Sequence, residues 1–454
     1  MNLAGKRTLV LGLGMTGMSM VRWLKAAGAQ VRVADTRRDP PNAEQLQTHY
    51  PDVGLASGPF SPPSFEGVDL LAVSPGVPIS EPLVRKSAAA GIPVVGDVEL
   101  FAQAQPSLAP APVLAITGSN GKSTVTELAG AMCRNAGMNT VVAGNIGIPV
   151  LDALAQARTS KPGVFVLELS SFQLETTASL NAAAAACLNL SEDHLDRYDG
   201  MADYAAAKER IFRGTGVQVI NRQDPLCSRM AQPGRRVSSF GLDAPRGSNE
   251  WGIHTDQSAA WLAEGGRRLF PVSGMRLAGM HNAANALAAL ALCRGIGLPY
   301  EPLLATLREF QGLPHRVQKI AEINGVSFFD DSKGTNVGAT VAALSGFTQP
   351  TVLIAGGDGK GQEFSPLQKP VRDRARAVVL IGRDAGRIEA VLQGSGVPLM
   401  RAMSMEEAVT VAYEAAREGD AVLLSPACAS FDMFRDYEHR AQVYAEAVRR
   451  LEAR

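Results

Sequence analysis

The chain has 454 residues, of which 46% are hydrophobic and 19% charged, with 44 basic and 44 acidic side chains. This length exceeds what one hydrophobic core supports, so several domains are expected. A net charge of zero without a dense charged block argues against nucleic-acid and membrane-surface partners. No apolar run reaches the roughly 18 residues that span a bilayer. Five scattered cysteines without a CxxC pair favour buried thiols in a reducing cytoplasm.

Short apolar strands alternate with alanine-rich helices along most of the chain. This alternation predicts parallel sheets covered by helices on both faces, with ligands at the carboxyl ends of the strands. The predicted strands are Thr8–Leu11, Gln30–Ala34, Leu70–Val73, Val113–Thr117, Thr140–Ala143, Val164–Leu169, Ala186–Leu190, Val217–Asn221, Thr351–Ala355, Ala377–Ile381 and Ala421–Leu424. Helices are predicted at Ala202–Phe212, Asn282–Leu292 and Pro302–Phe310.

Two changes of composition indicate linkers between domains. Gln103–Pro112 is rich in Pro, Ala and Gln, and Phe310–His315 contains a Gly-Leu-Pro run. These positions predict three α/β domains, covering residues 1–103, 104–312 and 313–454. The polar, glycine-rich stretch Gly241–Gly274 predicts a small antiparallel excursion in the middle domain.

A phosphate-binding loop is the strongest single signal. The apolar strand Val113–Ile116 breaks at Gly118, and a helix is predicted to start near Ser123. Such a turn aims backbone N–H groups and the positive end of a helix at one point. Lys122 supplies a charge for the β/γ-phosphates, and Ser123 offers a hydroxyl to Mg²⁺. The loop is two residues shorter than the common P-loop between its glycines, but the strand and helix around it favour a nucleoside triphosphate site.

The first domain opens with a dinucleotide-type fingerprint. Gly12, Gly14 and Gly17 follow a strand, and Asp35 ends the next strand. Glycines allow a diphosphate to approach, and the acid can take a ribose hydroxyl. NAD is only the commonest occupant of such a pocket, and a turn without a ligand is the alternative. The run Ser74–Val77, after another strand, is expected to form a second wall.

Polar residues of the middle domain also follow strands. Glu168 can bind Mg²⁺ or can simply lie at a sheet edge, and the residue alone does not decide between these readings. His194, in the polar run Asn189–Arg197, can ligate a metal as neutral imidazole. Lys208 on its predicted helix would, taken alone, be a solvated lysine. The amides of Asn282 and Asn285 share one face of an apolar helix and need partners.

The third domain contributes four polar clusters, after strands or after the linker. They are Pro314–Arg316, Asp330–Asn336, Gly356–Gly361 and Ser425–Asp432. Single clusters of this kind are usually loops and caps. Four of them in one domain indicate a binding site.

Taken together, these motifs resemble the Mur ligase family of ATP-dependent amide-forming enzymes of peptidoglycan precursor synthesis. The resemblance rests on the shortened phosphate loop, Glu168–Ser171, Asp193–Asp196, His281–Asn285 and Pro314–Arg316, in that order along the whole chain. Within the family, Asp331–Asn336 resembles the members that add D-glutamate. The implied fold is an N-terminal Rossmann-like UDP-binding domain, a central P-loop ATPase-like domain with a mostly parallel sheet, and a C-terminal Rossmann-like domain.

The resemblance also implies a role for each matching residue. The UDP-substrate pocket would contain Met15, Thr16, Asp35, Thr36, Arg37, Ser74, Gly76, Asn145, Ser170 and His194. ATP would be held by Gly118, Ser119, Asn120, Gly121, Lys122, Ser123, Thr124, Asn285, Arg316 and Asp331. The amino acid would contact Lys333, Thr335, Lys360, Ser430, Phe431 and Tyr437, although the family often has Leu and Phe at the last two positions. Two Mg²⁺ would be held by Ser123, Glu168, His194 and a carbamylated Lys208, and Lys122, Glu168, His194 and Lys208 would be catalytic.

The implied reaction joins D-glutamate to UDP-N-acetylmuramoyl-L-alanine through an acyl phosphate. The expected partners are these small molecules and ATP, with no nucleic acid and no membrane, and the protein is expected to be a cytoplasmic monomer. Four alternatives remain: another amino-acid-adding Mur-type ligase, a folate polyglutamylating ligase, a nicotinamide dehydrogenase and a nucleotide-dependent switch. The dehydrogenase leaves the Lys122 loop without a purpose, and the UDP-type first domain argues against the folate ligase.

Overall fold

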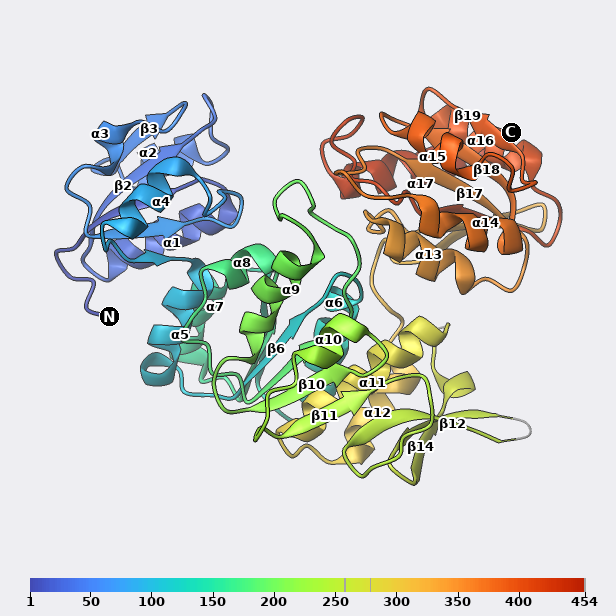
Figure 1. The fold of residues 1–454 in the computed structure, drawn as a ribbon, viewed down its shortest axis with the longest axis horizontal. Coiled ribbons are helices and arrows are strands. Elements are labelled where there is room, and N and C mark those ends of the chain that lie inside the picture. Colours follow the sequence, from blue (N-terminus) through green and yellow to red (C-terminus); the bar gives the residue numbers. More distant parts are fainter. Residues whose placement is uncertain (257–258, 278, 453–454) are drawn as a thin grey trace. The chain divides into compact units, whose positions relative to one another are not determined.

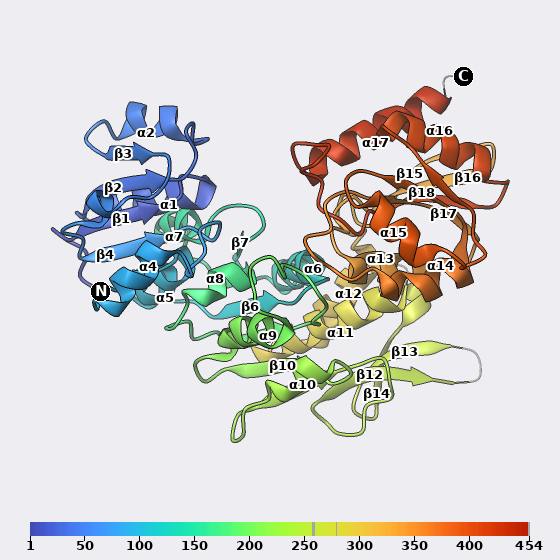
Figure 2. The ribbon, with the colours of Figure 1, turned by 45° about the horizontal axis from the view of Figure 1, so that its top comes forward.

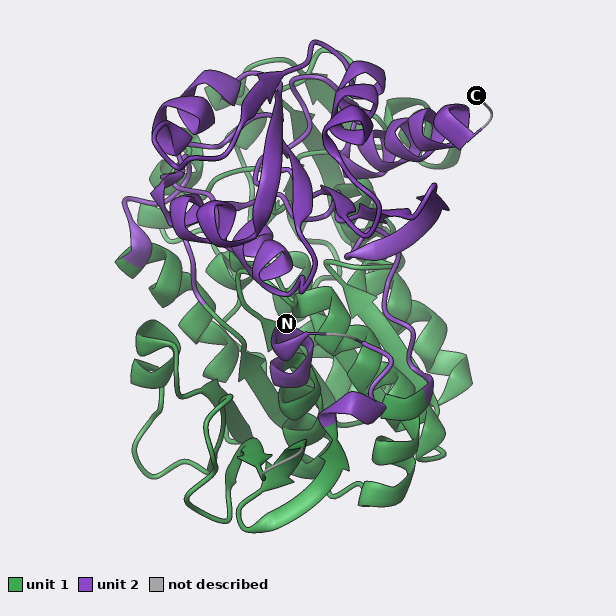
Figure 3. Cartoon of the chain, turned by 90° about the vertical axis from the view of Figure 1, so that its right-hand side faces the viewer, with its two compact units in different colours: residues 1–189, 202–271, 285–308 green, residues 190–201, 272–284, 309–454 purple. Residues whose placement is uncertain are grey.

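The computed structural model describes residues 1–256, 259–277 and 279–452, which form three sheets with helices on their faces (Figure 1). Contacts within the chain divide it into two units (Figure 3). The first unit comprises Met1–Asn189, Ala202–Pro271 and Asn285–Arg308 and contains the first two sheets. The second comprises Leu190–Met201, Val272–Ala284 and Glu309–Arg454 and contains the third sheet.

The first sheet is fully parallel, with the strand order β3-β2-β1-β4-β5 that is typical of nucleotide-binding α/β folds. Its strands are β1 (Arg7–Leu11), β2 (Gln30–Asp35), β3 (Gly54–Ser57), β4 (Leu70–Val73) and β5 (Val94–Val95). The helices are α1 (Met15–Ala26), α2 (Ala43–His49), α3 (Pro62–Phe65) and α4 (Pro82–Ala89). Gly12, Asp35 and Ser74 therefore meet at the carboxyl ends of β1, β2 and β4.

The second sheet has the order β14-β13-β12-β11-β10-β9-β6-β8-β7, parallel except for the antiparallel β12-β13-β14 meander. Its strands are β6 (Val113–Thr117), β7 (Thr140–Gly144), β8 (Val164–Glu168), β9 (Ala184–Cys187), β10 (Val217–Asn221), β11 (Val237–Phe240), β12 (Glu250–Thr255), β13 (Ala260–Glu264) and β14 (Arg267–Pro271). The helices are α5 (Asp97–Leu108), α6 (Lys122–Asn135), α7 (Val150–Ser160), α8 (Ser171–Glu175), α9 (Met201–Glu209), α10 (Pro225–Arg229), α11 (Met280–Gly295) and α12 (Tyr300–Glu309). The meander lies in the predicted antiparallel stretch, of which residues 257–258 are outside the described residues.

The third sheet has the order β15-β16-β20-β17-β18-β19, and only β15 is antiparallel. Its strands are β15 (Gln318–Ile323), β16 (Val326–Asp330), β17 (Thr351–Gly356), β18 (Ala375–Ile381), β19 (Leu399–Arg401) and β20 (Ala421–Leu424). Helices α16 (Met405–Ala415) and α17 (Tyr437–Glu452) pack on one face, and α13 (Val337–Ser345), α14 (Gln368–Arg374) and α15 (Ala385–Leu392) pack on the other (Figure 2). Its parallel strands are apolar on both faces because each face carries its own core.

Two segments differ from the sequence-based expectation. The strand expected at Ala186–Leu190 is β9, four residues of small side chains that end at Cys187. Alanines suit this central strand because α11 passes close to it: a Cβ on Gly295 would lie 3.0 Å from the Ala184 Cβ. The residues expected to form the first linker continue α5 to Leu108, because Ala and Gln favour helices. Pro106 lies inside the end of that helix.

The five cysteines are buried as free thiols. In the described part of the chain, no helix combines the length and the apolar character that crossing a bilayer requires.

Candidate active site

The phosphate loop joins β6 to α6 and needs glycine at two positions. Gly118 has φ +151° and Gly121, the N-cap of α6, has φ +84°, a region that favours glycine. A Cβ on Gly121 would lie 2.5 Å from Asn285 Oδ1, and one on Gly118 would lie 3.0 Å from the Leu188 Cβ. The loop therefore packs directly against the Asn285 amide, which was predicted to belong to the ATP site.

Asn189 holds this loop from the neighbouring strand and was not assigned a role from the sequence. Its carbonyl oxygen accepts from the Ser119 N–H at 2.8 Å, and its Oδ1 accepts from the Asn120 N–H at 2.8 Å. Its Nδ2 donates to the Asn120 carbonyl oxygen at 2.9 Å. The available signal is its place in the sheet: it follows β9, which pairs with β6.

Lys122 lies over the loop that precedes it. Its Nζ donates to the carbonyl oxygens of Gly118 at 2.9 Å and Ser119 at 2.8 Å. Ser123 and Thr124 follow in the first turn of α6, and both are buried. The loop thus gathers an ammonium group, a helix N-terminus and a hydroxyl within a few residues, as a triphosphate site requires.

Glu168 ends β8 beside the phosphate loop, because β8 pairs with β6 through Ile116 and Glu168. Its side chain is 2% exposed, and Asn145 Nδ2 donates to its Oε1 at 2.8 Å. Its Oε2 is buried without a hydrogen-bond partner among the residues that the structure describes. A buried carboxylate oxygen left in this way fits a Mg²⁺ ligand, since an unpaired charge is costly to bury.

No group of three or more His, Cys, Asp or Glu side chains in the described ranges could hold a metal ion. Mg²⁺ commonly takes one or two carboxylates and fills its other positions with substrate phosphates and water. The carboxylate of Glu168 and the hydroxyl of Ser123 are oxygen donors of the kind that such an ion takes.

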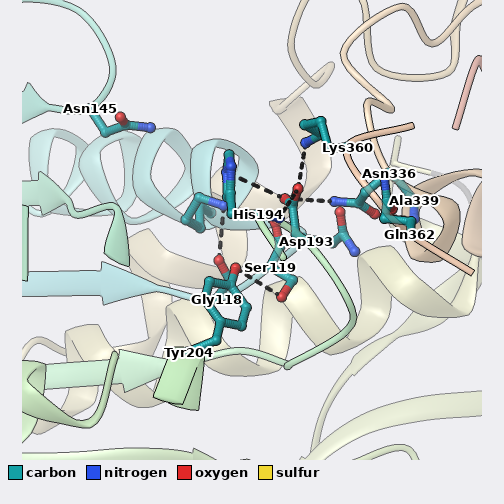
Figure 4. A network of polar contacts seen from close by, with 12 residues as sticks. Gly118, Ser119, Asn145, Asp193, His194, Tyr204, Asn336, Ala339, Lys360 and Gln362 are labelled. Atoms are coloured by element: carbon teal, nitrogen blue, oxygen red, sulfur yellow. Dashed lines mark hydrogen bonds and ion pairs between the residues drawn. The ribbon is translucent and has the colours of Figure 1, made fainter. Parts of the chain in front are cut away.

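Lys208 on α9 reaches the same loop. It is 1% exposed, and its Nζ donates to the Gly118 carbonyl oxygen at 2.9 Å and to Thr117 Oγ1 at 3.4 Å. It is not the solvated lysine that its helix position alone indicated. Tyr204, one turn earlier, places its ring 4.6 Å from the Lys208 Nζ. The Tyr204 hydroxyl lies 3.2 Å from Ser119 Oγ (Figure 4). Sequence reasoning missed Tyr204, although its spacing of four places it on the same helix face.

A cavity of about 570 Å³ lies in the first unit, at the carboxyl ends of the first sheet. It is lined by eight of the ten residues predicted for the UDP substrate, namely Met15, Thr16, Asp35, Thr36, Arg37, Ser74, Gly76 and Asn145. Gln173 also lines it and was not predicted. Ser170 is not among the lining residues; it forms a capping box with Gln173 at the start of α8. His194 belongs to the second unit.

Asp35 is the charged anchor of this cavity. Burial raises the pKa of Asp35, but hydrogen bonds from the Arg37 side chain and the Leu13 N–H outweigh this effect. The net result is a pKa of about 2, below the ordinary value. The Leu13 N–H lies 2.7 Å from Asp35 Oδ2, and Arg37 Nη2 lies 2.6 Å from the same oxygen. The carboxylate is thus ionised and holds Arg37 at the cavity wall.

The second unit contains the other predicted ATP residues, Arg316 and Asp331. Asp331 is buried, and Ser425 Oγ donates to its Oδ2 at 2.7 Å. Burial raises the pKa of Asp331 to about 7, although Ser425 and Arg316 oppose the shift. A Cβ on Gly334 would lie 2.6 Å from Asp331 Oδ2, so the loop after β16 closes tightly over this carboxyl group.

Residues predicted for the amino acid lie on loops of the second unit. Lys333 Nζ lies 5.1 Å from the centre of the Tyr437 ring. Lys360 has φ +51° and its Nζ forms an ion pair with buried Asp193, whose Oδ2 also accepts from Asn336 Nδ2 at 3.3 Å (Figure 4). Lys360 is therefore already placed against a carboxylate, the group that an amino-acid substrate would present.

The remaining predicted residues differ in exposure. Thr335 lies on the loop after β16, and its N–H donates to the Lys333 carbonyl oxygen at 3.0 Å. Ser430 is buried, whereas Phe431 is 75% exposed. The Phe431 side chain thus makes little contact with the fold around it.

Arg440 joins the two loops that carry most of these residues, and the sequence did not reveal it. It is fully buried on α17, where its guanidinium donates to Ser332 Oγ at 3.0 Å and to the carbonyl oxygens of Ser332 at 2.7 Å and Cys428 at 3.1 Å. Burial lowers the pKa of Arg440 to about 10. A buried cation on neutral oxygens is costly, which indicates that it is kept to hold these loops together.

Family models match the chain in three consecutive parts. The MurD-like N-terminal domain of Mur ligases matches residues 6–96, the Mur ligase middle domain matches 116–293, and the Mur ligase glutamate ligase domain matches 315–428. These matches confirm the three predicted α/β domains. The boundaries near residues 104 and 313 stay a prediction.

Full-length relatives are similar throughout. The UDP-N-acetylmuramoylalanine–D-glutamate ligase of Nitrosomonas europaea is 54% identical, covering 100% of this chain and 98% of its own length. The protein of the same name from Thiobacillus denitrificans is 57% identical, with coverage of 100% and 98%.

Solved structures show the same fold at lower identity. The UDP-N-acetylmuramate-alanine ligase of Thermotoga maritima superposes with a TM-score of 0.62 at 19% identity, over 98% of this chain and 100% of that one. MurF of Acinetobacter baumannii gives 0.62 at 18% identity, over 97% and 93%. With its three domains matched in order and relatives more than half identical along its whole length, the chain belongs to the Mur ligase family.

Proposed function

We propose that this chain is the ligase that joins D-glutamate to UDP-N-acetylmuramoyl-L-alanine at the expense of ATP, in peptidoglycan precursor synthesis. The observation that carries the proposal is the full-length identity to relatives named for this activity. The site supports it, because a phosphate loop, a cavity for a large nucleotide-linked ligand and loops with two lysines occur in one chain. We also expect the enzyme to act as a cytoplasmic monomer.

The reaction would proceed in two transfers. The terminal carboxylate of the alanyl group attacks the ATP γ-phosphorus, and ADP leaves, giving an acyl phosphate. The amine of D-glutamate then attacks the acyl carbon, and inorganic phosphate leaves as the amide forms. Water must be excluded between the steps, because it would hydrolyse the intermediate.

The chain's own residues would divide this work. Lys122 and the loop amides hold the phosphates and stabilise the charge that moves to them. The wall of Asp35 and Arg37 holds the UDP end of the substrate, while Asn145 lies toward Glu168. Lys333 and Lys360 bind the two carboxylates of D-glutamate, with Thr335, Ser430, Phe431 and Tyr437 around them. Asn285, Arg316 and Asp331 contact adenosine.

Ser123 and Glu168 would hold a Mg²⁺, which supplies charge neutralisation at the phosphates when it is bound. A second ion on His194 and carbamylated Lys208 stays a prediction. An ammonium cannot ligate Mg²⁺, whereas a carbamate offers anionic oxygens. The buried position of Lys208 beside the loop supports this assignment.

The test is phosphate release by the purified protein with ATP, Mg²⁺ and UDP-N-acetylmuramoyl-L-alanine. D-glutamate is compared with L-glutamate, L-alanine and meso-diaminopimelate. Phosphate release together with a new amide product for D-glutamate alone is the expected result. Turnover with another amino acid would keep the family and overturn the assigned substrate. Release that does not depend on any amino acid would overturn ligation altogether.

A further inference from the structure

Two buried carboxylates in the first turn of α5 are held in opposite ways. Burial raises the pKa of Asp97 to about 6, although hydrogen bonds from Gln173 and from the backbone N–H groups of Val98 and of Asp97 itself oppose it. Burial also raises the pKa of Glu99, but hydrogen bonds from Ser179 and the Ala178 amide outweigh it and hold that pKa below its ordinary value. The fold thus favours the ionised form of Glu99 and disfavours the ionised form of Asp97, two residues earlier.

Glu99 has the contacts of a structural anchor. Its Oε2 accepts from the N–H groups of Ala178 at 2.6 Å and Ser179 at 2.8 Å. Its Oε1 accepts from Ser179 Oγ at 2.6 Å and Gln103 Nε2 at 2.7 Å. These bonds connect α5 to the segment that follows α8, and none of them involves a residue predicted for the active site.

Asp97 has weaker support than Glu99, because its hydrogen bonds do not offset the effect of burial on its pKa. Its side chain is 1% exposed, and its Oδ2 accepts from Gln173 Nε2 at 3.1 Å. Its Oδ1 is buried and has no hydrogen bond to any described residue. Burying a carboxylate oxygen without a partner costs stability, so packing alone does not account for an acid at this position.

The side chain that donates a hydrogen bond to Asp97 belongs to a residue of the substrate cavity. Gln173 lines the cavity, and its Oε1 accepts from the Ser170 N–H at 3.1 Å and Ser170 Oγ at 3.2 Å. A carboxylate only accepts and a backbone N–H only donates, so the two neighbours allow one orientation of the Gln173 amide. The same contacts cap α8 at Ser170, two residues after Glu168.

We propose that Asp97 is a positioning residue for the substrate in this cavity, acting through Gln173 and retained at a cost in stability. It anchors the Nε2 end of the Gln173 amide, while the Ser170 N–H anchors the Oε1 end, and it thereby holds the Gln173 side chain at the cavity wall. This inference rests on the proposed function, because it assumes that the cavity takes the UDP-linked substrate.

The test compares Asp97→Asn with Glu99→Gln in the full-length enzyme. Asn is a neutral acceptor that can also donate, so it weakens the hydrogen bond that holds Gln173 Nε2, while the Ser170 N–H still holds Gln173 Oε1. We expect KM for UDP-N-acetylmuramoyl-L-alanine to rise about fivefold, roughly one hydrogen bond, with KM for ATP unchanged. The Tm of Asp97→Asn should equal or exceed that of the parent. Glu99→Gln should lower Tm and leave KM for the same substrate within twofold, as an anchor would.

A double-mutant cycle with Gln173→Met separates positioning from general packing. Asp97→Asn should have no further effect on this KM in the Gln173→Met background. An unchanged KM in stable Asp97→Asn, or additive effects in the cycle, would overturn the inference. A parent enzyme that does not bind the UDP-linked substrate would instead overturn the proposed function.

Discussion

The phosphate loop of the first unit and the amino-acid loops of the second unit are built on different principles. The first is a run of consecutive residues whose N–H groups, glycines and lysine converge because the backbone turns there. The second joins the loop after β16 to the loop after β20 and to α17, through contacts such as Ser332 Oγ to the Tyr437 carbonyl oxygen, 105 residues apart. The groups that would face phosphate in the first site come from one stretch of backbone, although Asn189 and Lys208 support it from a distance. The groups of the second site are themselves spread over distant segments, so their arrangement depends on each link between the loops.

The comparison predicts the largest loss for a charge removed from the local site. Lys122→Ala should lower kcat about a thousandfold or more, because its ammonium acts where transferred phosphate carries charge. The fold should persist, since the loop is held by Asn189 and by glycine geometry. Phosphate release measures the loss, and binding of the UDP-linked substrate should stay at the parental level. A variant that retains turnover would remove Lys122 from the mechanism.

The stability of the second unit should depend on pH, because Asp331 is a buried carboxyl group. The pKa of Asp331 is about 7 in the folded chain against an ordinary value of 3.8, so the native state binds a proton more tightly than the unfolded state. The associated stability is complete below about pH 4 and is lost as pH rises through 7, by at most about 4 kcal/mol. Asp331→Asn should remove this slope from chemical unfolding between pH 4 and 7. If the unfolding free energy of Asp331→Asn depended on pH as it does in the parent, a group other than Asp331 would bind the proton.

Arg440 tests the distant links directly. Arg440→Met would leave Ser332 Oγ and the carbonyl oxygens of Ser332 and Cys428 without their donor, at a cost of about 3 kcal/mol. KM for D-glutamate should rise about tenfold in the folded fraction, because Lys333 follows Ser332 directly. Arg449→Met, an exposed position on the same helix, is the matched control. Equal KM values for the two variants would show that the loops do not need this link.

The same contrast explains what the sequence alone could reveal. The alternation of strands and helices predicted the three sheets, and the glycine spacing around Lys122 predicted the phosphate loop. Asn189, Tyr204, Gln173 and Arg440 escaped prediction because each acts through a partner that only the folded chain brings near. Asn189 reaches the loop across a strand pair, and Arg440 reaches Ser332 across 108 residues. The strand predicted at Ala186–Leu190 is β9, which starts at Ala184 and ends at Cys187, because the alanines that begin it suit the close approach of α11, a tertiary contact.

The smallest effect is expected at Tyr437, where the family often has Phe. Its ring lies under Lys333, but its hydroxyl contacts Glu438 at 2.9 Å, and burial together with this bond raises the pKa of Tyr437 to about 12. The phenol is therefore neutral at working pH, and Tyr437→Phe keeps the ring face that the ammonium uses. We expect KM for D-glutamate to change less than about twofold, whereas Tyr437→Leu should raise it about threefold by removing the cation–π contact. A large rise in KM for D-glutamate in Tyr437→Phe would mean that binding depends on the hydroxyl and not on the ring.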